Sequence, residues 1–241
     1  MLKDWSNVII PEEEEINERL EKARNKLVQQ QILIMQKKLP VLVSFDGWGA
    51  AGKGSILGKI IKNIDPRFFK VAVMDKPTED EKRRPFLYRY VINIPEAGKF
   101  TFMDGGCLDE VTKQKLSGKI TDEEYKRKIE SVKRFERQLS DNGYLVIKFF
   151  FHIGEQEQRK RLTRLLDDKN TRWRVSEYDW WQNQHYKKSL KAFDQFIDDT
   201  SQSIAPWYII DATDKKWAQL QILETLVQAI DTALKNSTLS V

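Results

Sequence analysis

Apolar positions recur along the chain with two different spacings, which predict helices and strands in alternation. Residues 12–38 carry apolar side chains at helical spacing and predict one amphipathic helix that ends before Pro40. Short runs rich in β-branched and aromatic residues predict five strands, at 41–45, 69–74, 99–104, 144–153 and 207–212. The run at 144–151 is almost continuously apolar, which is typical of a central strand that is buried on both faces.

Helical patterns fill the intervals between these strands. One helix follows the glycine-rich segment after the first strand and stops at Asp65-Pro66. In the stretch 78–94 we expect Pro85 to kink or restart the helix. Further helices are predicted at about 108–141, at 154–167, at 176–200 and after residue 212. Strands that alternate with helices need crossover connections, so we predict an α/β fold with a mainly parallel sheet covered on both faces.

The segment "GWGAAGKGS" has the spacing of a phosphate-binding loop, with Gly47, four residues, then Gly52 and Lys53, between a strand and a helix. Glycines allow positive φ, so that successive backbone N–H groups converge on phosphate oxygens. Lys53 would reach the outer phosphates and offset the charge that develops in phosphoryl transfer. The alternative is an ordinary glycine turn with a surface lysine. The candidate phosphate-binding residues of the loop are Gly47, Gly49, Ala50, Ala51, Gly52, Gly54 and Ser55.

With this loop, the fold prediction becomes a P-loop kinase-like, three-layer α/β fold with a five-stranded sheet. We predict a single domain over residues 1–241, with 12–38 as an N-terminal helix and about 108–141 as a helical lid. The strict loop pattern has Ser or Thr directly after the lysine, whereas here Gly54 follows and Ser55 comes next. The Gly-Lys-Gly-Ser ending resembles the loops of nucleotide kinases such as adenylate kinase.

Candidate ligands for Mg²⁺ lie at the ends of two strands. Asp104 ends the apolar run 99–104 and precedes two glycines, where a carboxylate can help to hold the cation that bridges phosphate oxygens. Its alternative role is to cap the next segment. Asp46, at the end of the first strand, and the hydroxyl of Ser55 are further candidates. A phosphohistidine route through His152 or His185 has no supporting sequence feature, and we predict that His152 is structural.

Composition indicates the cellular compartment in which we expect the protein. Hydrophobic residues make up 40% and charged residues 32% of the 241 positions, and no run approaches the roughly 18 apolar residues that cross a bilayer. The N-terminus lacks the basic start and apolar stretch of a signal peptide. The single cysteine, Cys107, excludes an internal disulfide and fits a reducing compartment. We therefore predict a cytoplasmic protein with no membrane partner.

Charge is unevenly distributed. The net charge of +5 is too modest to indicate a nucleic-acid partner, and residues 11–21 are acidic. Basic runs follow at 81–85, 123–138, 157–165 and 171–175. A single run of this kind is usually the solvated face of a helix. Several of them flanking a phosphate loop favour a polyanionic substrate.

Many short motifs, in order and spacing, resemble the polyphosphate kinase 2 family from about Leu39 to Leu226. They are "FDGWGAAGKGS", "DPRFFKV", "KPTEDEKRRPFLYRY", "IPEAGKF", "FERQLSDNGYLVIKFFFHI", "EQRKRL", "TRWRVSEYDWW" and "APWYIIDATDK". The resemblance implies a P-loop kinase core with a helical lid. It also implies Mg²⁺-dependent phosphoryl transfer between inorganic polyphosphate and an adenine or guanine nucleoside mono- or diphosphate, by a homodimer or homotetramer.

The resemblance assigns roles to individual residues. Lys53 corresponds to the essential loop lysine and Asp104 to the acidic residue after the third strand. Arg89 and Arg172 match arginines near the phosphate path, and Arg174 falls where the family usually has a basic residue. On this basis the predicted catalytic residues are Lys53, Asp104 and Arg172, with Arg89 and Arg174 as phosphate ligands.

Two positions depart from the family pattern. Gly49 replaces an aspartate of the loop, and the sequence after Asp104 reads Gly-Gly-Cys-Leu where the family has Arg-Ser-Trp-Tyr. Both features are closer to the divergent first half of two-domain members, the polyphosphate:AMP phosphotransferases. Two alternatives stay open: a nucleoside monophosphate kinase that uses ATP, and a polyphosphate- or nucleotide-binding module with little or no turnover.

Overall fold

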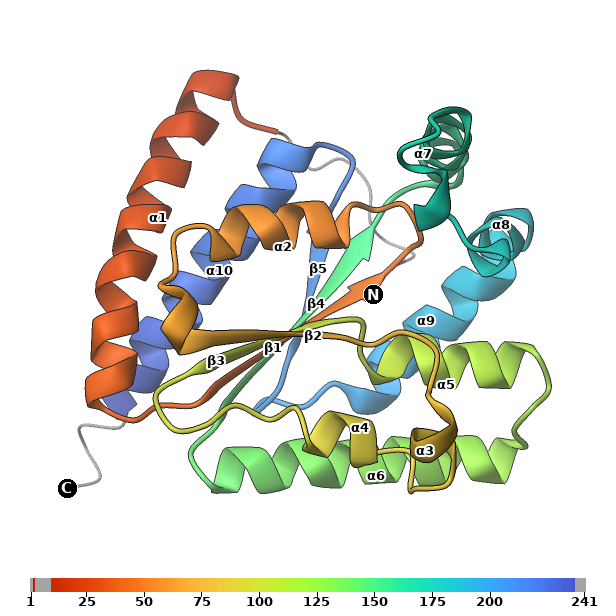
Figure 1. Cartoon of the computed structure of the whole chain (residues 1–241), viewed down its shortest axis with the longest axis horizontal. Helices are drawn as coiled ribbons and strands as arrows, with labels where there is room; N and C mark the ends of the chain where they lie inside the picture. Colours follow the sequence, from red (N-terminus) through yellow and green to blue (C-terminus); the bar gives the residue numbers. More distant parts are fainter. Residues whose placement is uncertain (1, 3–9, 237–241) are drawn as a thin grey trace.

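Five parallel strands form one sheet in the order β2-β3-β1-β4-β5 (Figure 1). The computed structural model describes residue 2 and residues 10–236 of the chain. All five predicted strands are confirmed, as β1 (Val41–Gly47), β2 (Phe69–Val73), β3 (Phe100–Asp104), β4 (Leu145–His152) and β5 (Trp207–Asp211). The sheet is parallel throughout because every connection between its strands carries a helix, which returns the chain to the same edge.

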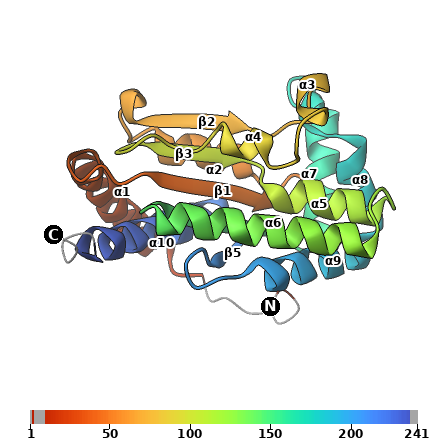
Figure 2. The same cartoon turned by 90° about the horizontal axis from the view of Figure 1, so that it is seen from below.

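Helices cover both faces of the sheet, which gives the predicted three layers (Figures 1 and 2). One layer contains α1 (Glu13–Gln36), α2 (Lys53–Ile61) and α10 (Lys215–Asn236). The other contains α5 (Cys107–Leu116), α6 (Asp122–Asp141) and α9 (Tyr186–Thr200). The remaining helices are α3 (Glu79–Lys82), α4 (Tyr88–Val91), α7 (Glu155–Asp167) and α8 (Glu177–Gln184), with short 3₁₀ helices at Pro66–Phe68 and Arg172–Arg174.

The central strands β1 and β4 are enclosed between these layers. Phe149, Phe150 and Phe151 are fully buried, and the ring of Phe45 on β1 stacks on Phe149 at 5.7 Å between centroids. A parallel strand that packs against helices on both sides has no solvent face, so its sequence is apolar at nearly every position rather than at alternate ones, with Lys148 as the exception within 144–151. The expectation for 144–151 is therefore confirmed.

Two predicted helical stretches are interrupted. The stretch 78–94 contains the two short helices α3 and α4, with Pro85 between them, as its fixed φ and missing N–H lead one to expect. The stretch 176–200 breaks at His185, whose φ of −115° and ψ of 36° end α8 before α9 begins. No proline or glycine marks this second break, so the sequence offers no signal for it.

The segment predicted as a lid forms the helix pair α5–α6, which turns at Gly118 with a φ of +69°. Its apolar side chains Val111, Ile129 and Val132 are buried, and α5 and α6 both pack on α9. This pair is thus part of one layer of the fold, and its closure over a ligand stays a prediction.

Within residue 2 and residues 10–236, no helix combines the length and the apolar content needed to cross a membrane. The N-terminal stretch on which the signal-peptide expectation rests lies mostly outside the described residues, so that expectation stays a prediction.

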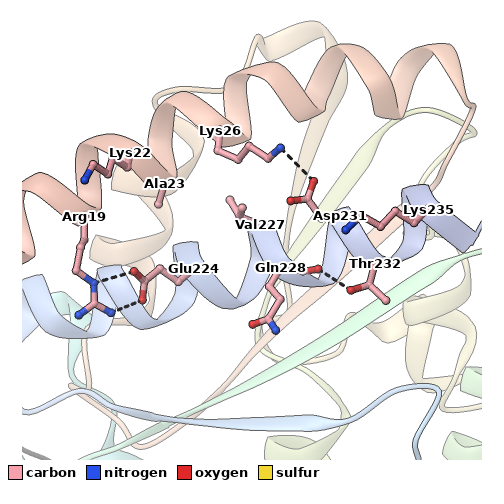
Figure 3. A pocket seen from close by; sticks show the side chains of 10 residues that line it. All are labelled: Arg19, Lys22, Ala23, Lys26, Glu224, Val227, Gln228, Asp231, Thr232 and Lys235. Atoms are coloured by element: carbon pink, nitrogen blue, oxygen red, sulfur yellow. Dashed lines mark hydrogen bonds and ion pairs between the residues drawn. The ribbon is translucent and has the colours of Figure 1, made fainter.

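An open groove of about 520 Å³ runs between α1 and α10 (Figure 3). Ion pairs cross it, from Arg19 to Glu224 at 2.7 Å and from Lys26 to Asp231 at 3.4 Å. None of the predicted site residues lines this groove. Its charged side chains form ion pairs between the two helices. The predicted phosphate-binding and catalytic residues lie in another part of the molecule.

Candidate active site

The phosphate-binding loop joins the carboxyl end of β1 to the N-terminus of α2. Gly47, Ala50 and Gly52 have positive φ values of 133°, 59° and 97°, which curl the backbone between strand and helix. Gly52 is the N-cap of α2, so the first N–H groups of the helix, from Lys53 onward, have no partner within it. A curled loop that leads into a helix N-terminus is an anion-binding geometry.

Close packing against β4 fixes the start of the loop. A Cβ on Gly47 would lie 2.4 Å from the carbonyl oxygen of Phe151, so no other residue fits there. The indole of Trp48 is fully buried and stacks on Tyr186 with 4.1 Å between ring centroids. Its Nε1 donates a hydrogen bond to Nδ1 of His152 at 3.3 Å. His152 therefore has a structural contact with the loop, in line with its predicted role.

Lys53 lies across the loop. Its Nζ donates hydrogen bonds to the carbonyl oxygens of Gly47 and Trp48, both at 3.1 Å. The same positive charge acts on the carboxyl groups of Asp46, Asp104 and Asp109, whose pKa values it lowers against the opposing effect of burial. The structure thus brings the predicted lysine together with both predicted aspartates.

Asp104 ends β3 beside the first turn of α2. Its Oδ2 lies 3.3 Å from the position that a Cβ on Gly54 would take. Burial raises the pKa of this carboxyl, Lys53 lowers it, and Asp75 raises it. A carboxylate next to a lysine and a helix N-terminus is suitably placed to share a divalent cation with bound phosphates.

Asp46 is a weaker candidate for a metal ligand. It is almost completely buried, and burial raises its pKa to about 6. Its Oδ2 accepts a hydrogen bond from Oγ of Ser44 at 2.6 Å, and its Oδ1 accepts one from the N–H of Gly106 at 2.9 Å. Both oxygens are therefore engaged within the protein.

The described residues contain no group of three or more His, Cys, Asp or Glu side chains that could hold a metal ion. This donor set still fits Mg²⁺, which commonly takes only one or two carboxylates and completes its shell with phosphates and waters. Asp104 would be the carboxylate here, with the hydroxyl of Ser55 on the exposed first turn of α2.

One glycine in each of the two departures from the family pattern lies against a carboxylate, whereas a Cβ on Gly105 would lie 3.2 Å from Cβ of Met74. A Cβ on Gly49 would be 2.1 Å from Oδ1 of Asp179, and a Cβ on Gly106 would be 2.3 Å from Oδ2 of Asp46. Neither position has room for a side chain in this packing. Asp179 is part of a capping box with Ser176 at the start of α8, a pattern that can be read from the sequence, although its contact with the loop cannot.

The three predicted arginines come from other elements. Arg89 is 6% exposed, its Nη2 donates to the carbonyl oxygen of Asp75 at 2.6 Å, and its Nη1 lies 3.6 Å from Glu110. Arg172 and Arg174 are exposed on the 3₁₀ helix between α7 and α8.

Sequence reasoning missed the side chains that contact the loop from α7 and α8. Arg161, 9% exposed, donates from Nη1 to the carbonyl oxygen of Ala51 at 3.2 Å. Gln158 and Gln182 bind the backbone of Gly49. The motif "EQRKRL" contains two of these residues, but nothing in its spacing indicates contact with a loop a hundred residues earlier.

Comparison with known proteins agrees with this geometry. The sequence profile of polyphosphate kinase 2 matches residues 11–238. The chain belongs to the polyphosphate kinase 2 family. The resemblance expected from the short motifs is therefore confirmed. A polyphosphate:AMP phosphotransferase of Pseudomonas syringae pv. tomato is 32% identical over 82% of this chain and 40% of its own length. An AMP/ADP-polyphosphate phosphotransferase of Meiothermus ruber is 27% identical over 90% of this chain and 79% of its own.

Solved structures of polyphosphate kinase 2 proteins share the fold. A putative member from Pseudomonas aeruginosa superposes with a TM-score of 0.91 at 28% identity, over 97% of this chain and 50% of that one. The enzyme named polyphosphate kinase 2 from Arthrobacter aurescens gives 0.84 at 25% identity, over 88% and 77%. The P-loop kinase-like fold prediction is confirmed. The chain spans about two fifths of the length of the polyphosphate:AMP phosphotransferases that it matches.

Proposed function

We propose that this chain is a Mg²⁺-dependent phosphotransferase that moves a phosphoryl group between inorganic polyphosphate and an adenine or guanine nucleoside mono- or diphosphate. The observation that carries the proposal is the position of Lys53, which lies across a curled phosphate loop with Asp104 beside the same helix N-terminus. This pairing of a cation and a carboxylate at a helix N-terminus, whose first N–H groups have no partner within the helix, is what phosphoryl transfer requires.

Each predicted site residue has its own role in phosphoryl transfer. The N–H groups at the end of the loop and in the first turn of α2 bind phosphate oxygens, and Lys53 exchanges its two carbonyl partners for the outer phosphates. Asp104 and Ser55 would hold Mg²⁺. When bound, this cation would offset negative charge on the phosphate oxygens. Arg172 and Arg174 stabilise charge on the transferred group, and Arg89 lines the phosphate path from α4.

Five cations on α6, beyond its acidic first turn, form a basic surface that supports a polyanionic donor. The helix carries Lys126, Arg127, Lys128, Lys133 and Arg134, with its apolar side turned to the core. Lys128 Nζ lies 4.1 Å from the ring centroid of Phe86, and burial lowers the pKa of this ammonium. We propose that these cations follow the phosphate chain, since a linear polyanion interacts best with spaced positive charges.

A second candidate function is a polyphosphate- or nucleotide-binding module with little or no turnover. The packing at Gly49 and Gly106 favours it, because both positions exclude the side chains that other family members use there. An ATP-dependent nucleoside monophosphate kinase shares the loop and stays the third candidate. By resemblance to the family, we further propose a cytoplasmic homodimer or homotetramer without nucleic-acid or membrane partners.

The test is phosphoryl transfer by the purified protein with Mg²⁺, first with AMP or ADP plus polyphosphate and then with AMP plus ATP. Any activity that remains in Lys53→Ala would come from contaminating kinases. Lys59→Ala is the matched control, because Lys59 is an exposed lysine on the same helix, away from the loop. We expect ATP to form from polyphosphate, to require Mg²⁺, and to be lost only with Lys53→Ala. Transfer from ATP alone would assign a monophosphate kinase. No transfer from either donor, with polyphosphate still bound, would assign a binding module.

A further inference from the structure

Side chains of α7 and α8 hold Gly49 on three sides. Its N–H donates to Oε1 of Gln182 at 3.2 Å, and its carbonyl oxygen accepts from Nε2 of Gln158 at 3.3 Å. The carboxylate of Asp179 occupies the remaining side, where a Cβ would be. Both backbone polar groups of this loop residue are thus satisfied by helices that follow β4, far away in the sequence.

The glutamines belong to a buried amide network. Gln158 and Asn183 are completely buried, and Gln182 is 1% exposed. Asn183 Nδ2 donates to Oε1 of Gln158 at 3.1 Å and to the carbonyl oxygen of Glu155 at 2.9 Å, and its Oδ1 accepts from Nε of Arg159 at 3.0 Å. Amides removed from water are costly unless they are paired, so such a network favours a single arrangement of its members.

The loop needs this support. Ala50, next to Gly49, has a φ of 59°, in the left-handed region that L-residues with a Cβ avoid. A chain segment of this kind samples other conformations unless its surroundings hold it. A loop that must be ordered when phosphate arrives binds phosphate more weakly than a loop already in shape.

We propose that Gln158 and Gln182 are positioning residues that keep the phosphate loop in its binding shape before the ligand arrives. This inference rests on the proposed function of the same loop. The network also joins the two helices that flank Arg172 and Arg174, so the loop and the arginine-bearing connection are positioned together. In this family member, Gly49 is required because α8 packs directly on it.

The experiment replaces each glutamine by a side chain of similar length without an amide, as Gln182→Met and Gln158→Met in the full chain. Binding of inorganic tripolyphosphate is measured by calorimetry, and KM and kcat are measured for transfer from polyphosphate. We expect tripolyphosphate to bind about tenfold more weakly, the loss of one or two buried hydrogen bonds. KM for polyphosphate should rise by about the same factor with kcat within about twofold, because the loss is shared by ground and transition states.

The matched control is Gln30→Met. Gln30 is a completely buried glutamine of α1 that donates to the carbonyl oxygen of Val227 and to Asp231, so its loss tests the removal of a buried amide away from the loop. We expect tripolyphosphate binding to equal that of the unmodified chain. A merely structural role of Gln182 would lower kcat through a smaller folded fraction and leave KM unchanged, which would overturn the proposal.

A further variant tests the proposal even if the glutamine variants do not fold. Gly49→Ala keeps every side-chain amide but forces its Cβ toward Asp179, and we expect the same rise in KM and loss of tripolyphosphate affinity. Unchanged affinity in the variants that fold contradicts the proposal. If the unmodified chain binds tripolyphosphate without turnover, only the proposed phosphotransferase function is contradicted. If it does not bind tripolyphosphate, both that function and the positioning role of the glutamines are contradicted.

Discussion

At the scale of single residues, the contacts of Trp48 show how a loop is fixed by groups outside its motif. Trp48 is buried between Tyr186 and Phe193, and its indole N–H donates to His152 Nδ1. This bond requires an unprotonated Nδ1, so the imidazole that accepts it is neutral. Burial lowers the pKa of His152, while Asp211 acts in the opposite direction. The anchor of the loop is therefore sensitive to acid.

The stability of the protein should decrease as His152 becomes protonated. The unfolded chain binds a proton at this residue below about pH 6.5, whereas the folded state binds it only at lower pH. This contribution is complete above pH 6.5 and is lost as the pH falls toward the folded pKa, at up to about 1.4 kcal/mol per pH unit. We expect His152→Asn, which keeps an acceptor, to lose less stability between pH 7.5 and 5.5 in urea unfolding.

His185→Asn is the control for this titration, because His185 is exposed at the end of α8. It should follow the unmodified chain over the same pH range. Equal pH dependence of His152→Asn and the unmodified chain would show that His152 does not couple protonation to folding.

At the scale of elements, a buried ion pair joins the α6 layer to the sheet. Lys148, in the middle of β4, donates to both carboxylate oxygens of Glu136 at 2.8 Å and to the carbonyl oxygen of Thr200 at 3.0 Å. Both side chains are about 95% buried. Burial lowers the pKa of Lys148 and raises that of Glu136, and each partner opposes the shift of the other. This charge pair thus joins α6 to the sheet in addition to the buried apolar side chains of the helix.

Glu136→Gln should destabilise the protein by about 3–5 kcal/mol, because it leaves the Lys148 ammonium buried without its counter-charge. Replacing both partners, as Glu136→Leu with Lys148→Met, should recover most of this loss. Denaturant unfolding of the single and double variants measures the difference. Glu18→Gln, which breaks the exposed pair with Lys22, is the control and should leave stability nearly unchanged. A double variant as unstable as Glu136→Gln would contradict this reasoning.

At the scale of the whole molecule, the cations of α6 lie on the layer of the sheet opposite α1 (Figure 1). They follow an acidic first turn of the same helix, Asp122, Glu123 and Glu124, and Lys133 pairs with Glu130 at 3.5 Å. A polyanion that follows α6 would therefore meet spaced positive charges beyond this first turn, and its binding would be electrostatic.

Affinity for long-chain polyphosphate should therefore fall with salt, by about tenfold between 50 and 200 mM if two or three cations are neutralised. Lys126→Ala with Lys133→Ala should reduce the slope of log affinity against log salt. Lys22→Ala, an exposed lysine of α1, should leave the slope unchanged. Salt-independent binding, followed by calorimetry or filter retention, would rule out the basic surface of α6 as the polyphosphate track.

The sequence by itself determined the strands, most helices, the phosphate loop and its lysine. These features depend on local spacing: period, glycine positions, and the order of strand, loop and helix. The α/β class follows from the alternation alone, and the short motifs were enough for the family. Even Asp104 could be placed beside the loop, since parallel strands end at one edge of the sheet.

Only the tertiary structure decided what surrounds the loop. Gln158, Gln182, Asp179 and Tyr186 contact it across long sequence separations, and a helical or polar pattern around each of them looks the same whether or not that contact exists. The bond from Gly106 to Asp46 and the contacts of the buried Arg89 with Asp75 and Glu110 likewise depend on other segments of the chain. The local spacing of residues predicts which element a residue belongs to. Packing between elements decides which atoms come into contact, and this packing depends on residues from the whole chain.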